Sequence, residues 1–313
     1  MDVSIIMINY NTYDLTKDAI ISILNNTADI DYELILVDND SPDKSGEKLF
    51  EEFSENIVYI AAGGNLGTSK AFNLGLKKAR GKYILWLNTD ILIKENFVKT
   101  LFNYMEDDPK CGICGGNILD FNGDPTTSFH TMPSIKSDKK NFSVMRLILN
   151  KIFRISKKEE VYNYSENPIE VGYICGADMM IRRCLFDELG GFDEDIFMYG
   201  EETEFAFRVK QNTDYKIMSV PNAHIFHLEG ASFSKDKRKF NKRRYKTFLD
   251  GVTIFYTKCY GKKSAIKYLK ILYRYFSRLK MLNRIVGRKD EADYCKQTAE
   301  TIVEKIQECK TAA

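Results

Sequence analysis

The chain has 313 residues and a mass of 36.2 kDa, which is enough for one large domain or two. Its 44% hydrophobic and 29% charged residues allow a sizeable core and exclude a globally disordered protein. No apolar run approaches the roughly 18 residues of a membrane span, and the first residues lack the basic region of a signal peptide. Seven scattered cysteines argue against a disulfide framework, so we expect a protein of the reducing cytoplasm.

The first 119 residues alternate short apolar runs with stretches of helical periodicity. Strands are predicted at residues 3–8, 33–37, 57–61, 83–87 and 112–119, and helices at 15–24, 46–53, 69–79 and 97–105. Apolar strands separated by helices indicate right-handed βαβ units and an α/β fold with a mostly parallel central sheet.

Residues 120–167 interrupt this rhythm. They are polar, with a possible short helix at 142–153, and we interpret them as a loop over an active site. Regular elements return with a strand at 171–182, a short helix at 184–189 and a helix at 201–211. A strand at 215–220 follows, and Pro221 is expected to end it.

After residue 234 the composition changes to basic, aromatic-rich helices, so we place a domain boundary there, between 1–234 and 235–313. Although the formal net charge is only +2, residues 235–288 hold 18 Lys and Arg against two Asp, a local net charge of +16 that leaves −14 elsewhere. Such a segment is typical of a surface that meets phosphates, on lipid or on nucleic acid.

One helix of this extension is predicted to be amphipathic. Its apolar face consists of Ala265, Leu269, Leu272, Phe276 and Leu279, and its opposite face of Lys263, Lys267, Lys270, Arg274 and Arg278. The helix could pack its apolar side on the first domain, attach the protein to an anionic membrane surface, or do both. Residues 290–309 mix charges of both signs and are predicted to form a solvated or self-associating helix, which leaves a homo-oligomer open.

Polar segments follow the first four predicted strands: Asn9-Tyr10-Asn11-Thr12, Asp38-Asn39-Asp40-Ser41, Gly63-Gly64-Asn65-Leu66-Gly67 and Asn88-Thr89-Asp90. Single polar tips are usually turns or helix caps. Four in succession favour a ligand site, because ligands of parallel sheets bind beyond the carboxyl ends of the strands.

The third of these segments lacks the G-x-G-x-x-G pattern of a dinucleotide site. It could be a plain flexible turn. A turn that lets the backbone approach a nucleotide, whose phosphates meet the following helix N-terminus, fits better.

Two further segments could carry chemistry. Asp90, at the exit of a buried strand, is suited to a divalent cation that bridges a diphosphate, and His227 is a better second ligand than His224. Glu201 and Glu202 begin a helix, where they either complement its dipole or supply a general base. Cys111 and Cys114 have no second pair at metal-site spacing and are predicted to be buried thiols.

Six motifs occur together in this order: Asn9-Tyr10-Asn11, Val37-Asp38-Asn39-x-Ser41, Gly64-Asn65-x-Gly67 followed by Asn73, Leu87-Asn88-Thr89-Asp90, Gly200-Glu201-Glu202 and His227-x-x-Gly230-x-Ser232. The set resembles glycosyltransferase family 2, most closely its bacterial rhamnosyltransferase-like branch, over about residues 2–235. The resemblance implies a GT-A fold, with a nucleotide-sugar-binding half over about 1–119 and an acceptor and catalytic half over about 120–234. It also implies sugar transfer from a nucleotide donor with inversion at the anomeric carbon.

The resemblance also implies roles for individual residues. The nucleotide-sugar site would comprise Tyr10, Asn11, Asp38, Asn65, Gly67, Asn88 and Asp90, with Asp38 at the nucleobase. Asp90 and His227 would hold Mg²⁺ or Mn²⁺ on the diphosphate. Glu202 would be the catalytic base, with Glu201 in reserve, and Arg208 matches a family arginine.

Two residues depart from the family pattern. Asn88 replaces the first aspartate of the D-x-D motif, and Glu202 stands where an aspartate is usual. A catalytically impaired scaffold therefore remains an alternative, as does a basic nucleic-acid-binding protein, although no base-reading motif accompanies the charge.

We expect a metal-assisted hexosyltransferase of bacterial cell wall polysaccharide synthesis, peripheral on the inner face of the cell membrane. Its donor would be dTDP-rhamnose or a UDP-sugar, and its acceptor lipid-linked or a polysaccharide. No nucleic acid partner is expected.

Overall fold

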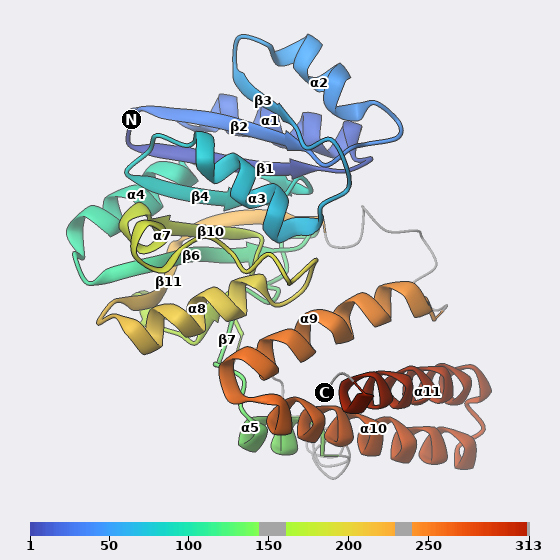
Figure 1. The fold of residues 1–313 in the computed structure, drawn as a ribbon. Coiled ribbons are helices and arrows are strands. Elements are labelled where there is room, and N and C mark those ends of the chain that lie inside the picture. Colours follow the sequence, from blue (N-terminus) through green and yellow to red (C-terminus); the bar gives the residue numbers. More distant parts are fainter. Residues whose placement is uncertain (144–160, 229–239, 312–313) are drawn as a thin grey trace. The chain divides into compact units, whose positions relative to one another are not determined.

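The computed structural model describes residues 1–143, 161–228 and 240–311, which form two compact units (Figure 1). The first comprises the described residues of Met1–Met132, Lys157–Glu194 and Glu202–Lys235. The second comprises those of Pro133–Ser156, Asp195–Glu201 and Asp236–Ala313. The chain therefore enters the second unit twice before residue 236, at about 133 and at 195.

The first unit begins with the predicted alternation of strands and helices. The strands are β1 (Val3–Asn9), β2 (Tyr32–Asp38), β3 (Ile57–Ala61) and β4 (Tyr83–Leu87), and the helices are α1 (Tyr13–Asn26), α2 (Ser45–Phe53), α3 (Gly67–Lys78) and α4 (Phe97–Asp107). The β1 strand pairs in parallel with β2 and β4, and β2 pairs in parallel with β3. Each of these strands therefore ends at the same edge of the sheet.

The sheet continues beyond β4 with strands from later in the chain. They are β5 (Ile91–Leu92), β6 (Cys111–Leu119), β8 (Ile169–Glu170), β10 (Asp178–Arg182) and β11 (Lys216–His227). The order is β3-β2-β1-β4-β10-β6-β11-β5, with β8 beside β11. The pairings of β1 with β2, β1 with β4, β2 with β3 and β6 with β11 are parallel, whereas β10 is antiparallel to both of its neighbours. The sheet is therefore mostly parallel, as the sequence predicts.

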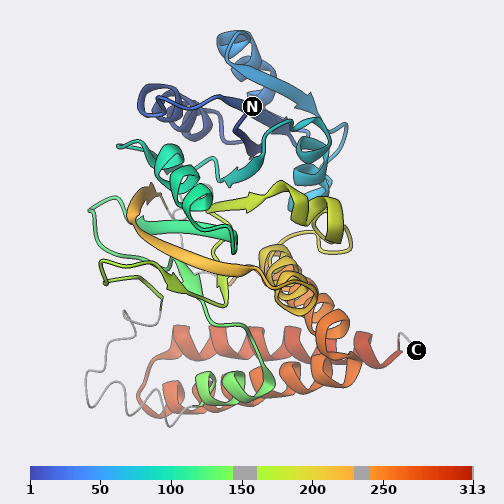
Figure 2. The same cartoon turned by 90° about the vertical axis from the view of Figure 1, so that its left-hand side faces the viewer.

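Helices cover both faces of this sheet (Figures 1 and 2). Alternate side chains of one strand enter different cores, since successive residues of a strand point to opposite faces. Ile5 and Met7 of β1 pack with residues of α1, α2 and α4. Ile6 packs with residues of α3, α7 (Arg183–Leu189) and α8 (Glu201–Asn212). Burial on both faces explains why the strands are almost continuously apolar.

Two strand predictions need correction. The strand predicted at 171–182 is divided, because its β9 part (Tyr173–Ile174) leaves the main sheet to pair with β7 (Phe129–His130). A Cβ on Gly172 would lie 2.1 Å from the backbone nitrogen of Met132, so only glycine permits this close approach.

The second correction concerns Pro221, which does not end its strand. β11 runs through it to His227, and the register to β6 shifts between Ser219 and His224. Proline has no N–H to donate to a ladder, and an irregular stretch of pairing tolerates it. The longer strand carries His227 to the edge where β1, β2 and β4 end.

The second unit is helical. It contains α5 (Ile135–Asn141), α9 (Lys242–Tyr260), α10 (Lys262–Ile285) and α11 (Lys289–Thr311). The α5 helix lies where a loop was predicted, and its N-terminus is capped by Ser134 and Ser137. Most of the helix predicted at 142–153 lies outside the described residues. Among the described residues, no helix is long and apolar enough to cross a membrane.

The α11 helix is not simply solvated. It packs on α9 and α10, with Ala292, Cys295, Thr298, Ala299 and Ile302 buried. Its acidic side chains pair with α9: Glu304 Oε1 lies 2.7 Å from Lys242 Nζ, and Glu308 Oε1 lies 2.9 Å from Lys246 Nζ. The acidic residues among 290–309 thus neutralise part of the positive charge of α9 and help to hold α11 against it.

Candidate active site

The carboxyl edge of the parallel strands gathers the polar segments that the sequence predicts to bind a ligand (Figure 1). Asn9 is the hub of this edge, and its side chain is completely buried. Its Nδ2 lies 2.8 Å from Asp38 Oδ1 and 2.8 Å from Ser45 Oγ. Its Oδ1 accepts hydrogen bonds of 2.9 Å from the hydroxyls of Thr12 and Thr16. Asn9 therefore fixes the end of β2 to the end of β1.

Asp38 is held in one orientation by its neighbours. The Ser41 hydroxyl donates to its Oδ1 at 2.6 Å, and the Ser41 backbone N–H donates to its Oδ2 at 3.1 Å. A Cβ on Gly46 of α2 would lie 2.2 Å from Asp38 Cγ, so the absence of a side chain at Gly46 makes room for the carboxyl group. A carboxylate offers about four acceptor sites, so Asp38 keeps capacity for a ligand.

The rim beside Asp38 is built from strained backbone. Asn11 (φ 56°), Asp40 (φ 65°) and Lys44 (φ 58°) all occupy the left-handed region, which is uncommon for residues other than glycine. The Asn11 backbone N–H donates to Ser41 Oγ at 3.1 Å, which places this residue next to the Asp38 network. Tyr10 is 42% exposed, so its ring is available at the surface of the same rim.

Asn39 joins the β2 end to the glycine turn before α3, a connection that the sequence analysis missed. Its Nδ2 donates to Asn65 Oδ1 at 3.2 Å, and its Oδ1 accepts from the Leu66 N–H at 2.9 Å. Gly63 and Gly67 have φ values of +73° and +79°, a conformation that glycine adopts at little cost. The only sequence signal for this role was the position of Asn39 directly after Asp38.

The structure brings Asp90 and His227 together although they are 137 residues apart. His227 Nε2 lies 3.0 Å from Asp90 Oδ1, and both side chains are largely buried. Antiparallel pairing of β5 with β11 sets His227 opposite Ile91, and the Leu228 N–H donates to the Asp90 carbonyl at 2.8 Å. His224 instead lies 3.0 Å from Glu95.

The Asp90–His227 pair suits a small divalent cation that also binds a substrate. In the part of the chain that is described, no three His, Cys, Asp or Glu side chains cluster as a complete metal site. Mg²⁺ is usually bound through one or two carboxylates together with substrate phosphates, and imidazole is a further ligand for transition metals. One carboxylate and one imidazole therefore fit Mg²⁺ or Mn²⁺ only if further ligands, such as phosphate oxygens of a substrate, were supplied from outside the protein.

Asn88 and Thr89 link this pair to the rest of the edge. The Asn88 N–H donates to the Ala177 carbonyl at 3.1 Å, which anchors the turn to the segment before β10. The hydroxyls of Thr89 and Thr12 lie 3.4 Å apart, which connects the turn after β4 to the turn after β1. All four predicted polar segments thus lie at one edge of the sheet. Side-chain hydrogen bonds join the segments after β2 and β4 to the segment after β1, and the segment after β3 to the segment after β2.

Glu201 and Glu202 begin α8, and the two differ in exposure. Glu201 is 4% exposed, whereas Glu202 is partly exposed. Tyr199 (φ 71°) and Gly200 (φ 112°) form a left-handed turn immediately before them. The more accessible carboxyl group, that of Glu202, is better suited to meet a substrate.

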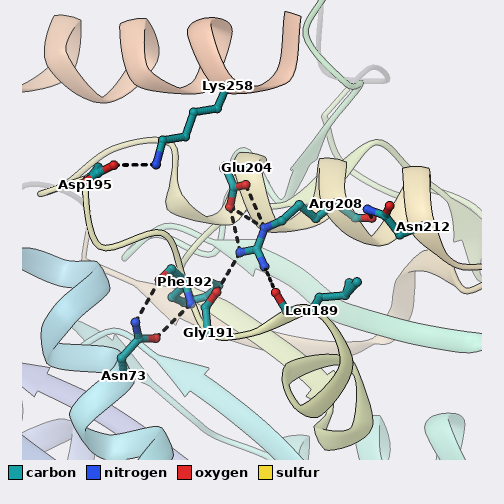
Figure 3. Close-up of polar contacts among 9 residues, drawn as sticks. All are labelled: Asn73, Leu189, Gly191, Phe192, Asp195, Glu204, Arg208, Asn212 and Lys258. Atoms are coloured by element: carbon teal, nitrogen blue, oxygen red, sulfur yellow. Dashed lines mark hydrogen bonds and ion pairs between the residues drawn. The ribbon is translucent and has the colours of Figure 1, made fainter.

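A brace of polar contacts holds the segment that leads to α8 (Figure 3). The Arg208 guanidinium binds both carboxylate oxygens of Glu204 and donates to the carbonyls of Leu189 and Gly191 at 2.6 and 2.7 Å. Asn73 of α3 donates to the Phe192 carbonyl and accepts from the Phe192 N–H, both at 2.9 Å. Arg208 and Asn73 therefore position the chain rather than contact a ligand.

Asp178 is a buried acid that the sequence analysis did not single out. It is completely buried at the start of β10, opposite Leu87, and its Oδ2 accepts from the Gly116 N–H at 2.6 Å. Burial raises the pKa of this carboxyl group well above its usual value. Burial therefore disfavours the charged form of this group, which lies in the middle of the sheet.

Comparisons with known proteins agree with this layout. The family described as Glycosyl transferase family 2 matches residues 4–190, more than half of the chain. The minor teichoic acid biosynthesis protein GgaB of Bacillus subtilis is 40% identical over 110 residues, which are 34% of this chain and 12% of that protein. The N-acetylglucosaminyl-diphospho-decaprenol L-rhamnosyltransferase of Mycobacterium tuberculosis is 24% identical over 65% of this chain and 68% of its own length.

A solved structure shares the fold over nearly the whole chain. The crystal structure of residues 1–349 of S. aureus TarS superposes with a TM-score of 0.52 at 14% identity, and covers 98% of this chain and 92% of that one. The expectation of a mostly parallel α/β fold with C-terminal helices is confirmed.

Proposed function

Because this chain belongs to glycosyl transferase family 2, we propose that it transfers a sugar, rhamnose first among the candidates, from a nucleoside diphosphate to an acceptor hydroxyl. The observation that carries the proposal is the Asp90–His227 pair, at the same sheet edge as Asp38. The L-rhamnosyltransferase relative, whose name contains a diphospho-decaprenol, supports rhamnose as the sugar and a lipid-linked or polysaccharide acceptor.

The donor nucleotide is assigned to the edge formed by β1, β2 and the glycine turn. The fixed Asp38 carboxylate accepts a hydrogen bond from the ring N–H of uracil or thymine, with Tyr10 and Asn11 beside it. Asn65 and Gly67 line the path of the phosphates toward the N-terminus of α3, where helix dipole and backbone N–H groups favour negative charge. Asn88, directly after β4, is assigned to the same nucleotide-sugar site.

Asp90 and His227 are the residues that would hold Mg²⁺ or Mn²⁺ against the diphosphate. When bound, the cation would stabilise the negative charge that grows on the leaving nucleoside diphosphate. With Asn88 in place of a second carboxylate, the site has less negative charge of its own, so cation affinity is expected to depend on bound nucleotide.

Glu202 is assigned as the general base. The acceptor oxygen attacks the anomeric carbon, its proton passes to the Glu202 carboxylate, and the bond from that carbon to the diphosphate oxygen breaks. One base and no covalent nucleophile make this a single displacement, so the anomeric configuration inverts. Glu201, more deeply buried, is the reserve candidate.

Binding of nucleotides measured by calorimetry tests the donor assignment. Wild-type protein is titrated with dTDP, UDP, GDP and ADP, with Mg²⁺, with Mn²⁺ and with a chelator. We expect dTDP or UDP to bind at least tenfold more tightly than either purine, and chelation to weaken that binding. A preference for a purine nucleotide would overturn the Asp38 assignment. Equal nucleotide affinity with metal and with chelator would overturn the role of Asp90.

A further inference from the structure

The outward face of α10 combines charge and apolar surface in an order that points to a membrane. Seven residues recur along it at spacings of three or four, the interval that keeps side chains on one face of a helix: Lys263, Lys267, Lys270, Arg274, Arg278, Met281 and Ile285. We name this set the α10 stripe. From its first to its last residue it spans about 33 Å, at 1.5 Å per residue.

All five cations of the α10 stripe are exposed, whereas on the opposite face Ala265, Leu269 and Leu272 are buried and Phe276 and Leu279 are partly buried. Ala265, Leu269 and Leu272 pack inward, against the other helices of the unit. The apolar face of α10 therefore packs on other helices of the same unit, and its basic face stays exposed to solvent. Because packing uses the apolar side chains and surface binding would use the basic ones, the helix can do both.

The positive charge of the stripe is not neutralised by the unit's own acids. The α10 helix contains eight Lys and Arg and no Asp or Glu. Among the described residues, the ion pairs of this unit join α9 to α11 or to Asp195, or lie within α11, and none involves a cation of the α10 stripe. An external anionic partner would complete the pairing.

The apolar end of the stripe decides which anionic partner fits. Met281 is 58% exposed, Ile285 is 73% exposed, and Val286 directly after the helix is 64% exposed. Arg284 and Arg288 flank these three side chains and are exposed as well. Large apolar side chains flanked by cations suit the boundary of a bilayer, where anionic headgroups meet acyl chains. The backbone of a nucleic acid offers such side chains no apolar environment.

We propose that the α10 stripe docks on an anionic lipid surface, with the five cations over the headgroups and Met281, Ile285 and Val286 inserted at the acyl boundary. The inference does not depend on the proposed activity, because it concerns binding of the protein without substrate. Each basic residue near anionic lipid adds an attraction that salt screens, and the inserted side chains add a contribution that salt does not screen.

Co-sedimentation with lipid vesicles tests whether this surface binds lipid. One set of vesicles contains phosphatidylcholine alone, and the other contains about 30 mol% phosphatidylglycerol as well. We expect binding only to the anionic vesicles, and a loss of at least tenfold in the Lys267→Glu, Lys270→Glu, Arg274→Glu variant. Reversal of three exposed lysines of the first unit, Lys78, Lys110 and Lys216, makes the same change of charge and should leave binding within twofold. Circular dichroism checks that both variants fold. Should the reversal variant unfold, the Lys267→Gln, Lys270→Gln, Arg274→Gln variant replaces it.

Insertion has its own measurement. The chain has a single tryptophan, Trp86, which is 4% exposed, so a tryptophan introduced at position 286 reports its own environment. The emission of Val286→Trp should shift to shorter wavelength on anionic vesicles, and that of Phe121→Trp, on a 77% exposed residue of the first unit, should not. Equal binding to neutral vesicles, unchanged binding of the reversal variant, an unshifted emission, or tighter binding to DNA or RNA than to vesicles would each overturn the proposal.

Discussion

At the scale of single residues, the site separates side chains that organise the edge from side chains left to meet a ligand. Asn9 and Ser41 are buried and hydrogen-bond to each other and to Asp38, and buried Asn39 hydrogen-bonds to Asn65 and Leu66. Tyr10, Asn11 and Asn65 are exposed at the rim. A preset frame reduces the entropy lost on binding, so it would favour binding of the proposed nucleotide.

Replacement of Asp90 by alanine should lower transfer on the order of 10²–10³-fold, because it removes the carboxylate proposed to hold the cation on the diphosphate. The fold should survive, since the residue lies at a strand end. Activity at graded Mn²⁺ concentrations measures this. Asp107→Ala, an exposed aspartate at the end of α4, is the matched control and should behave as wild type. Full activity with unchanged metal dependence in Asp90→Ala would contradict the assignment.

Glu202→Gln should cut turnover by roughly 10²–10⁴-fold, the usual contribution of a positioned base, because glutamine cannot accept the proton. Binding of dTDP should remain within about twofold, since the change keeps size and polarity. Single-turnover rates together with calorimetry separate the two effects. Glu201→Gln is the control, and if it proves the more damaging change, the base is Glu201.

Asp178→Asn should stabilise the protein near neutral pH and have less effect in acid. Burial raises the pKa of the folded-state carboxyl, whereas the unfolded carboxyl ionises near its ordinary value of about 3.9. Between those two pKa values the unfolded chain releases a proton that the folded chain keeps, so stability falls as pH rises. The gain in melting temperature of the variant over wild type should therefore grow from pH 4 to pH 7. A gain that is the same at every pH would mean that Asp178 is ionised in the folded protein.

At the scale of elements, the brace in front of α8 determines where Glu202 lies. Arg208 ties α8 to residues 189–191, and Asn73 ties α3 to Phe192 and Glu194 (Figure 3). A Cβ on Gly191 would lie 2.4 Å from Asn73 Oδ1, which leaves room there only for glycine. The helix start is thus fixed from both sides by hydrogen bonds to backbone groups.

Asn73→Ala should cost about 1–3 kcal/mol in free energy of unfolding, because it leaves the buried backbone groups of Phe192 unpaired. It should also lower kcat more than it weakens dTDP binding, since Asn73 positions the helix that carries the proposed base. Urea unfolding and steady-state kinetics measure the two effects. Asn212→Ala removes a side-chain hydrogen bond at the exposed end of the same helix and should change neither by much. A purely structural role would lower stability and leave kcat unaffected.

At the scale of the whole molecule, charge is divided between the parts of the chain. Residues 235–288 carry a net charge of +16, to which the eight Lys and Arg of α10 contribute, and −14 remains elsewhere. The carboxylates of α11 reduce the repulsion among the positive charges of the helical unit. Among the described residues, the ion pairs that they form with another helix involve lysines of α9 and no cation of the α10 stripe. The exposed charge that remains is available to an outside partner.

The charge reversal in the α10 stripe should separate two kinds of substrate. Transfer to a lipid-linked acceptor in anionic vesicles should fall at least tenfold, because three changes each remove roughly 1 kcal/mol of surface attraction. Transfer to a short soluble acceptor should be unchanged, since no stripe residue is assigned to the catalytic site. Equal losses on both acceptors would indicate that the helix supports the fold or the catalytic site instead.

The sequence by itself determined the alternation of strands and helices, the four polar strand ends and the identity of the family. These features are local, since apolar periodicity and turn residues act within a few positions of the chain. Glu202 and His227 were proposed from their local segments and from the order of motifs, and their catalytic and metal-binding roles stay predictions.

Only the tertiary structure decided how distant segments combine. Pro221 predicts a strand end, yet the irregular pairing with β6 accommodates it and carries His227 to within 3.0 Å of Asp90. Asn39 and Asp178 gain their environments from segments far away in the chain, and α11 is covered because it faces α9 and α10. Such contacts depend on long-range packing free energy, which local sequence patterns do not encode.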